Sequence, residues 1–224
     1  MIHTARKNPL VTFVEFAILL ALEFLFCFTV LGSIPIGPVV ATTMMVPVIV
    51  CSITLGKWYG LALGGIAGLF SFIVNSFITP TVTSFMFTPV CAFPGSDKGT
   101  WFSLIICFLP RALGGFLPGL VFEFFRLSCR KKRPSGALSL VYYGICGFLG
   151  SAVNTIGVLG LFWSYCTFFQ SGNLELLGTL GTATVGAAVG ITVLTNGLPE
   201  AILAVFVGAG ACKPINHYLT YNDF

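Results

Sequence analysis

Charged residues are scarce in this chain. Only 8% of its 224 residues are charged and 56% are hydrophobic, whereas a soluble domain carries roughly 25% charged residues. A water-soluble surface cannot be built from that composition. Histidine is rarer still, because His3 and His217 are the only two and both lie near the ends of the sequence. We therefore expect no catalytic or metal site built on histidine in the apolar middle of the chain.

Motifs that mark several enzyme classes are also missing. The sequence has no P-loop of the form G-x-x-x-x-G-K-[ST], no H-E-x-x-H and no G-x-S-x-G. Its eight cysteines form no C-x-x-C pair and have no neighbouring histidine, which argues against a zinc site and against a disulfide framework. We expect no enzymatic activity, no metal and no cofactor. If ATP drives the work of this chain, a separate subunit must hydrolyse it.

What the sequence has instead is a series of long apolar runs. Runs of about 20 residues match the roughly 30 Å hydrocarbon core of a bilayer at 1.5 Å of rise per helical residue. The first run is too long for the core of a signal peptide and contains Glu15 and Glu23, so we interpret it as a span. We predict an all-α, polytopic membrane protein of one domain, 1–224. Its six predicted transmembrane helices cover residues 11–31, 38–55, 57–78, 101–126, 138–163 and 197–214.

The start of the sixth helix is predicted from Thr195-Asn196-Gly197-Leu198-Pro199-Glu200. Polar capping candidates, then a proline early in the helix and an acid in its first turn are typical of a helix N-terminus. Residues 165–195 are then a partly helical external segment rich in Gly and Thr. Alternatively, residues 178–212 form one unbroken, kinked helix. A break at membrane depth is tolerated only in contact with protein or a cavity, so it would mark a pocket wall.

Basic residues predict the orientation, because cytoplasmic loops are enriched in Lys and Arg. With both termini cytoplasmic, nine basic residues lie inside, only Lys98 lies outside, and Arg111 lies within a span. The nine are Arg6, Lys7, Lys57, Arg126, Arg130, Lys131, Lys132, Arg133 and Lys213. We interpret the cluster at 126–133 as the cytoplasmic flank of a span and expect no nucleic-acid partner.

Arg111 is the most informative single residue. It lies about ten residues, or about 15 Å, into the span 101–126 from its outer end. An arginine at that depth costs several kcal/mol unless it is paired, which makes it a candidate for a functional site. Its planar fork suits a carboxylate held at two points. Alternatively, it forms an internal ion pair with Glu200 or Glu23 that only joins helices.

Further polar residues in or near the apolar helices are candidate substrate ligands. Asn75, Asn154 and Asn196 can bind a hydroxyl or an amide, although an amide in a span can also bond only to another helix. Glu200 either shapes the pocket beside Arg111 or only stabilises a helix N-terminus. Trp163 either stacks on the solute or anchors its helix at the membrane interface.

The first span has two different faces. At about 100° per residue, Ala17 and Ala21 point one way while Glu15 and Glu23 point roughly opposite. Acids in a span should face the protein interior, which leaves the two alanines on the outside of the bundle. There they either allow a partner helix to dock closely or simply face lipid.

These elements together resemble the substrate-binding (S) component of energy-coupling factor (ECF) vitamin transporters, a type of ABC importer. The similarity covers nearly the whole chain, and within the family it is strongest to pantothenate-type S components. The motifs that carry it are Ala17-x-x-x-Ala21, Ile34-Pro35-Ile36-Gly37-Pro38, Ala41-Thr42, Pro47-Val48-Ile49, Leu55-Gly56, Gly60 to Gly68, Phe87-Thr88-Pro89, Pro110-Arg111, Gly150 to Leu159 and Thr195 to Ala201.

The resemblance implies a six-helix protein of the bacterial cytoplasmic membrane that binds a vitamin from outside. It also implies that Ala17 and Ala21 dock on a transmembrane T component, which two cytoplasmic ATPase subunits drive. Pantothenate is the favoured solute because its carboxylate offers Arg111 a partner. Two rival functions are an ion-coupled carrier acting alone, with Glu15, Glu23 and Glu200 as proton sites, and a membrane enzyme or assembly factor, for which no nucleophile and base are visible.

Overall fold

The computed structural model describes residues 9–29, 32–36, 39–78, 80, 84–91, 99–129, 136–169 and 197–221. Asn196 and residues 170–195 of the predicted external segment lie outside these described residues. So do the residues that decide between a kinked and a broken helix over 178–212.

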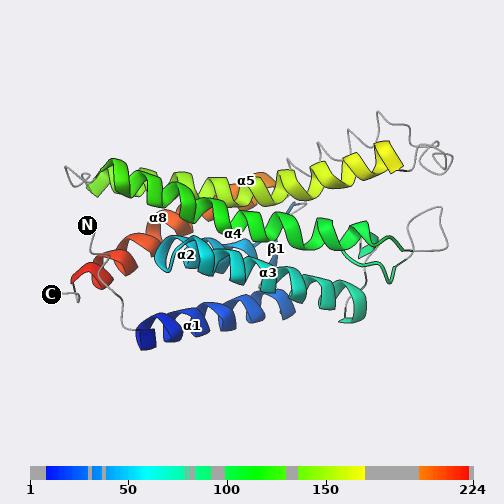
Figure 1. Ribbon diagram of the computed structural model, residues 1–224, viewed down its shortest axis with the longest axis horizontal. Helices are drawn as coiled ribbons and strands as arrows, with labels where there is room; N and C mark the ends of the chain where they lie inside the picture. The colour runs from blue at the N-terminus through cyan, green and yellow to red at the C-terminus, as the bar shows by residue number, and fades with distance from the viewer. Residues whose placement is uncertain are drawn as a thin grey trace.

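Six α-helices form the body of the described chain, and most of them run along its long axis (Figure 1). They are α1 Pro9–Phe28, α2 Met45–Thr54, α3 Lys57–Ile73, α4 Phe102–Ser128, α5 Gly136–Phe169 and α8 Leu198–Tyr221. Four stretches are long and apolar enough to cross a bilayer, namely Pro9–Phe28, Lys57–Ile78, Phe102–Ser128 and Ala137–Tyr165. Helix α2 and the apolar part of α8, Leu198–Gly210, are shorter.

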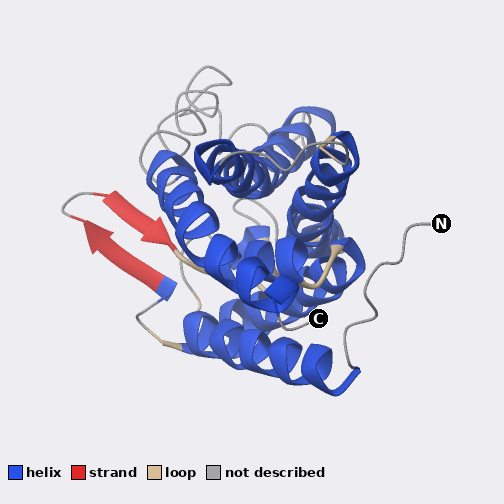
Figure 2. Cartoon of the chain, turned by 90° about the vertical axis from the view of Figure 1, so that its left-hand side faces the viewer, coloured by secondary structure: helices blue, strands red, loops and turns tan. Residues whose placement is uncertain are grey.

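The predicted helix over 38–55 is wrong in its first part. Strands β1 (Ser33–Ile36) and β2 (Val39–Thr42) pair there as an antiparallel hairpin, with Ser33 opposite Thr42 and Ile36 opposite Val39 (Figure 2). The run Val39-Val40-Ala41-Thr42 is mostly β-branched, which favours a strand, and the prolines at 35 and 38 cannot continue a helix. The all-α prediction therefore holds for the body of the described chain but not for this hairpin.

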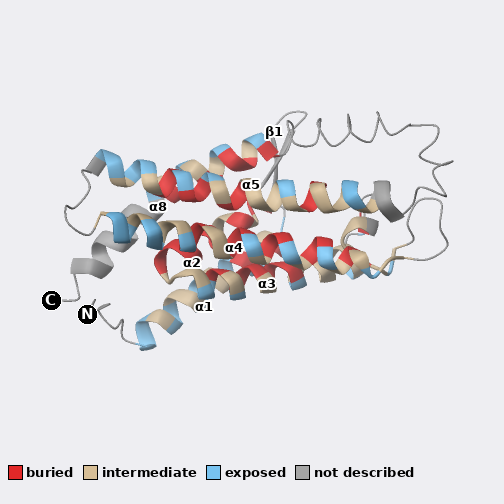
Figure 3. Cartoon of the chain, turned by 45° about the horizontal axis from the view of Figure 1, so that its top comes forward, coloured by how far each residue is buried: buried red, intermediate tan, exposed pale blue. Residues whose placement is uncertain are grey.

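Helix α2 is a core helix. All but one of its ten residues are buried, and it contacts α1, α3, α4, α5 and α8. Ten residues rise only about 15 Å, half the thickness of a bilayer core, so α2 cannot cross by itself. A helix that is apolar on all sides belongs inside a protein, and Figure 3 shows α2 almost wholly buried, with further buried residues on the helices around it.

Glycines bring α3 and α4 into backbone contact. A Cβ atom on Gly60 would collide with the carbonyl oxygen of Gly115, and one on Gly115 would collide with that of Gly60. Gly64 lies in the same way against the carbonyl oxygen of Arg111, and Gly68 against Phe108. Small residues at this spacing let two helices approach closely within a membrane. The contact decides which α4 residues face α3.

Gly115→Ala should lower the free energy of unfolding by about 1–3 kcal/mol, because the new methyl group overlaps backbone of α3. Gly65→Ala is the matched control, since nothing lies within 4 Å of the Cβ it would add. That control should be neutral or slightly stabilising, because Ala favours a helix over Gly. Thermal unfolding in detergent measures both variants. An equal loss in the two would contradict the backbone contact.

Candidate functional site

Arg111 lies buried in the middle of α4 and is held at three points. Its side chain is only 8% exposed. Nη1 donates a hydrogen bond to the carbonyl oxygen of Cys107 at 2.7 Å, and Nη2 donates one to Oγ of Ser71 on α3 at 3.0 Å. The guanidinium carbon lies 5.0 Å from the centre of the Phe87 ring. These contacts satisfy a charge that would otherwise be costly in an apolar bundle.

The helix geometry explains why Arg111 reaches Ser71. Helical side chains lean toward the N-terminus of their own helix, so Arg111 extends from its backbone toward the level of Cys107. Gly64 holds α3 against the backbone of Arg111, and the thiol of Cys107 donates to the carbonyl oxygen of Gly68 at 3.3 Å. Ser71, one turn beyond Gly68, is therefore within reach of the guanidinium.

Asn75 continues this network away from Arg111. Its Nδ2 donates to the carbonyl oxygen of Ser71 at 2.8 Å, and its Oδ1 accepts from Oγ of Ser84 at 3.0 Å. Its neighbour Ser76 donates from Oγ to Oγ1 of Thr88 at 2.7 Å. Both residues lie in the π-helical turn Val74–Ile78, and the segment they bind begins with the 3₁₀ turn Ser84–Met86. Isolated π turns often occur at functional sites.

No salt bridge to Arg111 is present within the part of the chain that the structure describes. The pair found there is Lys57 with Glu123, at 2.8 Å, which joins the start of α3 to the end of α4. Glu23 is fully buried on α1, where its Oε1 accepts from the thiol of Cys27 at 3.3 Å. The guanidinium of Arg111 has five N–H groups, and two of them make the hydrogen bonds to Cys107 and Ser71. The other three N–H groups have no acceptor among the described residues.

Asn154 lies on the face of α5 that is packed on α4, against Gly114, which is one helical turn after Arg111. Its Cβ is 3.5 Å from the position that a Cβ on Gly114 would take, and the methyl group of Met45 lies 2.7 Å from that position. Oδ1 of Asn154 is buried and has no hydrogen-bond partner among the described residues. A buried amide oxygen in this state is unfavourable unless a ligand or water meets it.

Glu200 lies in the first turn of α8, which begins at Leu198, one residue after the predicted start of this helix. It is 5% exposed. Gly197, at the start of the helix, packs on the side chain of Thr155, the residue after Asn154. Buried Arg111 and Glu200 and half-buried Asn154 thus come from α4, α8 and α5, three helices that pack in the order α4, α5, α8.

Trp163 and Asn75 differ from this group in their surroundings. The side chain of Trp163 is 51% exposed near the end of α5, as expected of an interfacial anchor. The amide of Asn75 is bonded on both sides by Ser71 and Ser84. Asn196 lies outside the described residues.

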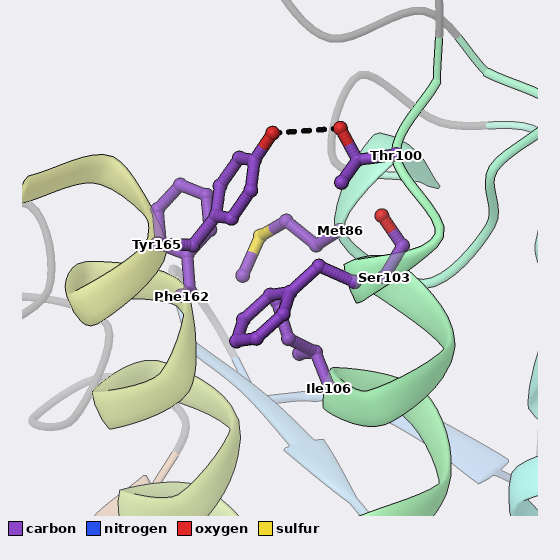
Figure 4. A pocket seen from close by; sticks show the side chains of 7 residues that line it. Met86, Thr100, Ser103, Ile106, Phe162 and Tyr165 are labelled. Atoms are coloured by element: carbon purple, nitrogen blue, oxygen red, sulfur yellow. Dashed lines mark hydrogen bonds between the residues drawn. The ribbon is translucent and has the colours of Figure 1, made fainter. Parts of the chain in front are cut away.

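A small hollow lies between the first turns of α4 and the end of α5 (Figure 4). It has no space large enough for a water molecule, whereas typical small-molecule sites enclose roughly 300–1,000 Å³. Oγ1 of Thr100 and the hydroxyl of Tyr165 are joined across it by a 2.7 Å hydrogen bond. Phe102 stacks on the ring of Tyr165 with centroids 5.2 Å apart. The hollow is lined by Met86, Thr100, Phe102, Ser103, Ile106, Phe162 and Tyr165.

The two faces of α1 are placed largely as the sequence predicts. Glu23 and Cys27 are its buried residues, and Ala17 and Ala21 are exposed. Glu15 is half-buried and so lies nearer the edge of the helix contact. Among the residues described, no group of three or more His, Cys, Asp or Glu side chains is placed to hold a metal ion.

Ser71, Ser84 and Phe87 complete the surroundings of Arg111, but sequence reasoning did not assign them a role at this site. A signal for Ser71 was available, because it lies four residues before Asn75 and hence on the same face of the helix. Ser84 and Phe87 come from a loop whose path no periodicity predicts.

Comparisons with known proteins agree with this architecture. The model of the family described as "ECF transporter, substrate-specific component" matches residues 11–209. The pantothenic acid transporter PanT of Lactococcus lactis subsp. cremoris is 35% identical over 170 residues, which cover 76% of this chain and 74% of that protein. Both the family and this relative are transporters. The chain therefore belongs to the family of substrate-specific components of ECF transporters, and it is a multi-pass membrane protein.

Proposed function

We propose that this chain captures pantothenate from outside the cell and that Arg111 holds its carboxylate. The observation that carries the proposal is the buried guanidinium, which has three N–H donors left and no salt bridge among the described residues. A bound carboxylate would supply the missing counter-charge with paired hydrogen bonds. The similarity to a pantothenic acid transporter over 76% of the chain supports the same ligand.

The rest of pantothenate consists of an amide and two hydroxyl groups. Asn154 is the first candidate to bind them, because its buried Oδ1 lacks a partner among the described residues and can accept from an N–H or O–H group. Glu200 and Asn196 are further candidates at and before the start of α8. Trp163 contacts the solute only if a loop holds the ligand at the end of α5. Asn75 acts indirectly, through its hydrogen bonds to Ser71 and Ser84.

Delivery of the solute requires partners. We propose that Ala17 and Ala21 dock on a transmembrane T component, which two cytoplasmic ATPase subunits drive. In support, both alanines are exposed on α1, while its opposite side carries the buried Glu23. Both termini are cytoplasmic in this proposal, because that orientation places nine basic residues inside and one outside.

A second candidate is an ion-coupled carrier of a small organic anion that works without partners. Glu23 favours it, because Oε2 of this fully buried acid has no hydrogen-bond partner within the described part of the chain. An intramembrane acid of this kind is a candidate proton site. Uptake into vesicles that contain only this chain, driven by a pH gradient and abolished in Glu23→Gln, would favour the carrier. ATP-dependent uptake that requires the partner subunits would favour the first proposal.

Arg111→Ala should weaken pantothenate binding by about 2–5 kcal/mol, which is more than tenfold in Kd, because it removes one partner of a buried charge pair. Panthenol has an alcohol in place of the carboxylate and is the matched ligand, whose affinity should change much less. Arg126→Ala, at the exposed inner end of α4, is the control variant. Calorimetric titration of the purified chain measures each pair. Equal losses for both ligands, or none, would contradict the proposed role.

Replacing both alanines, Ala17→Leu with Ala21→Leu, should abolish pantothenate uptake by the assembled transporter and leave pantothenate binding intact. The larger side chains prevent close approach of a partner helix but point away from the bundle. Ala62→Leu, at an exposed alanine on α3, is the matched control and should transport normally. Uptake is measured in cells that also produce the T component and the ATPases. Normal uptake by the double variant would exclude docking through α1 at these residues.

A further inference from the structure

The contacts of Arg111 belong to a closed ring of interactions that starts and ends at its guanidinium. From the guanidinium the path runs to Ser71, then to Asn75, and from Asn75 to Ser84. The backbone N–H of Phe87 donates to the carbonyl oxygen of Ser84 at 2.9 Å, and the Phe87 ring returns to the guanidinium at 5.0 Å. One side of Arg111 is thus fixed by Ser71 of α3, and one face by the loop segment that the π-helical turn Val74–Ile78 binds.

Ser71 has the most direct position in this ring of interactions. It is 3% exposed, so water does not compete for its hydroxyl. Its Oγ accepts from Nη2 of Arg111 at 3.0 Å and also lies 3.5 Å from Nδ2 of Asn75. The bond from Arg111 is charge-assisted, which makes it stronger than a neutral hydrogen bond. Because Nη1 is fixed on the carbonyl oxygen of Cys107, the bond to Ser71 determines the direction in which the remaining N–H groups of the guanidinium point.

Asn75 fixes Ser71 and the loop at once. Its Nδ2 bonds to the carbonyl oxygen of Ser71, and its Oδ1 accepts from Ser84, whose carbonyl oxygen also accepts from the backbone N–H of Thr88 at 3.1 Å. Loss of Asn75 would therefore release both the hydroxyl partner of Arg111 and the segment that carries Phe87.

We propose that Ser71 and Asn75 are positioning residues that orient the guanidinium of Arg111 for a carboxylate and so select an anionic ligand. The inference depends on the proposed role of Arg111. Orientation matters here because a guanidinium binds a carboxylate strongly only when two N–H groups meet its two oxygens in one plane. A rotated guanidinium keeps its charge but loses that paired geometry.

The test compares pantothenate with panthenol on purified protein. Ser71→Ala should weaken pantothenate binding about tenfold or more, the usual effect of losing a hydrogen bond to a charged group, and change panthenol binding by less than about twofold. Ser71→Thr keeps the hydroxyl and should retain most of the discrimination between the two ligands. Asn75→Ala should reduce that discrimination in the same direction.

Two further variants keep the test decisive. Ser52→Ala removes another buried serine, which packs against Gly60 and Gly119 and has no hydrogen-bond partner among the residues that the structure describes, so it should leave both affinities unchanged. Ser71→Cys preserves volume but is a poor acceptor, and it replaces Ser71→Ala if that variant does not fold.

Retained discrimination in the Ser71 and Asn75 variants, or equal losses for both ligands, would overturn the inference. If Arg111→Ala abolishes discrimination while Ser71→Ala does not, the positioning role fails and the proposed function stands. If Arg111→Ala leaves discrimination unchanged, the proposed function itself fails.

Discussion

A positive charge buried among apolar helices is the constraint on which the rest of this structure depends. An isolated arginine in a bilayer costs several kcal/mol, and the fold around Arg111 offsets that cost in a specific way. Glycines on α3 bring its backbone to α4, so that Ser71 and the carbonyl oxygen of Cys107 can accept from the guanidinium. The same arrangement leaves three N–H donors of Arg111 without an acceptor among the described residues, and the proposed function assigns them to a ligand. The bonds to Cys107 and Ser71 thus both stabilise the buried guanidinium and determine which of its N–H groups stay available.

The helices around Arg111 have different structural roles. The core helix α2 fills the centre, which allows the longer helices to surround it, and α5 brings the unpartnered amide oxygen of Asn154 beside α4. Helix α1 lies at the edge, with exposed alanines on one face and Glu23 buried on the other. Helix α1 also packs on α3, the helix whose Ser71 accepts a hydrogen bond from Arg111. The proposed docking face and the proposed binding site therefore meet through one helix.

Much of this arrangement could be predicted from the sequence because bilayer thickness and the cost of buried charge act on short stretches. The start of α8 followed from its capping residues and Pro199, and the burial of Arg111 and Glu23 followed from their positions in apolar runs. The prediction of a single helix over 38–55 was wrong because hydropathy does not distinguish a β-branched strand from a helix. Ser84 and Phe87 could not be assigned, because their contacts with Asn75 and Arg111 depend on how a loop folds back over α3.

A crystal or cryo-EM structure of the chain with pantothenate bound tests the central claim most directly. The account predicts both carboxylate oxygens within hydrogen-bond distance of N–H groups of Arg111, with the bonds to Cys107 and Ser71 retained. A bound pantothenate whose carboxylate lies elsewhere, with Arg111 still bonded only to Cys107 and Ser71, would contradict it.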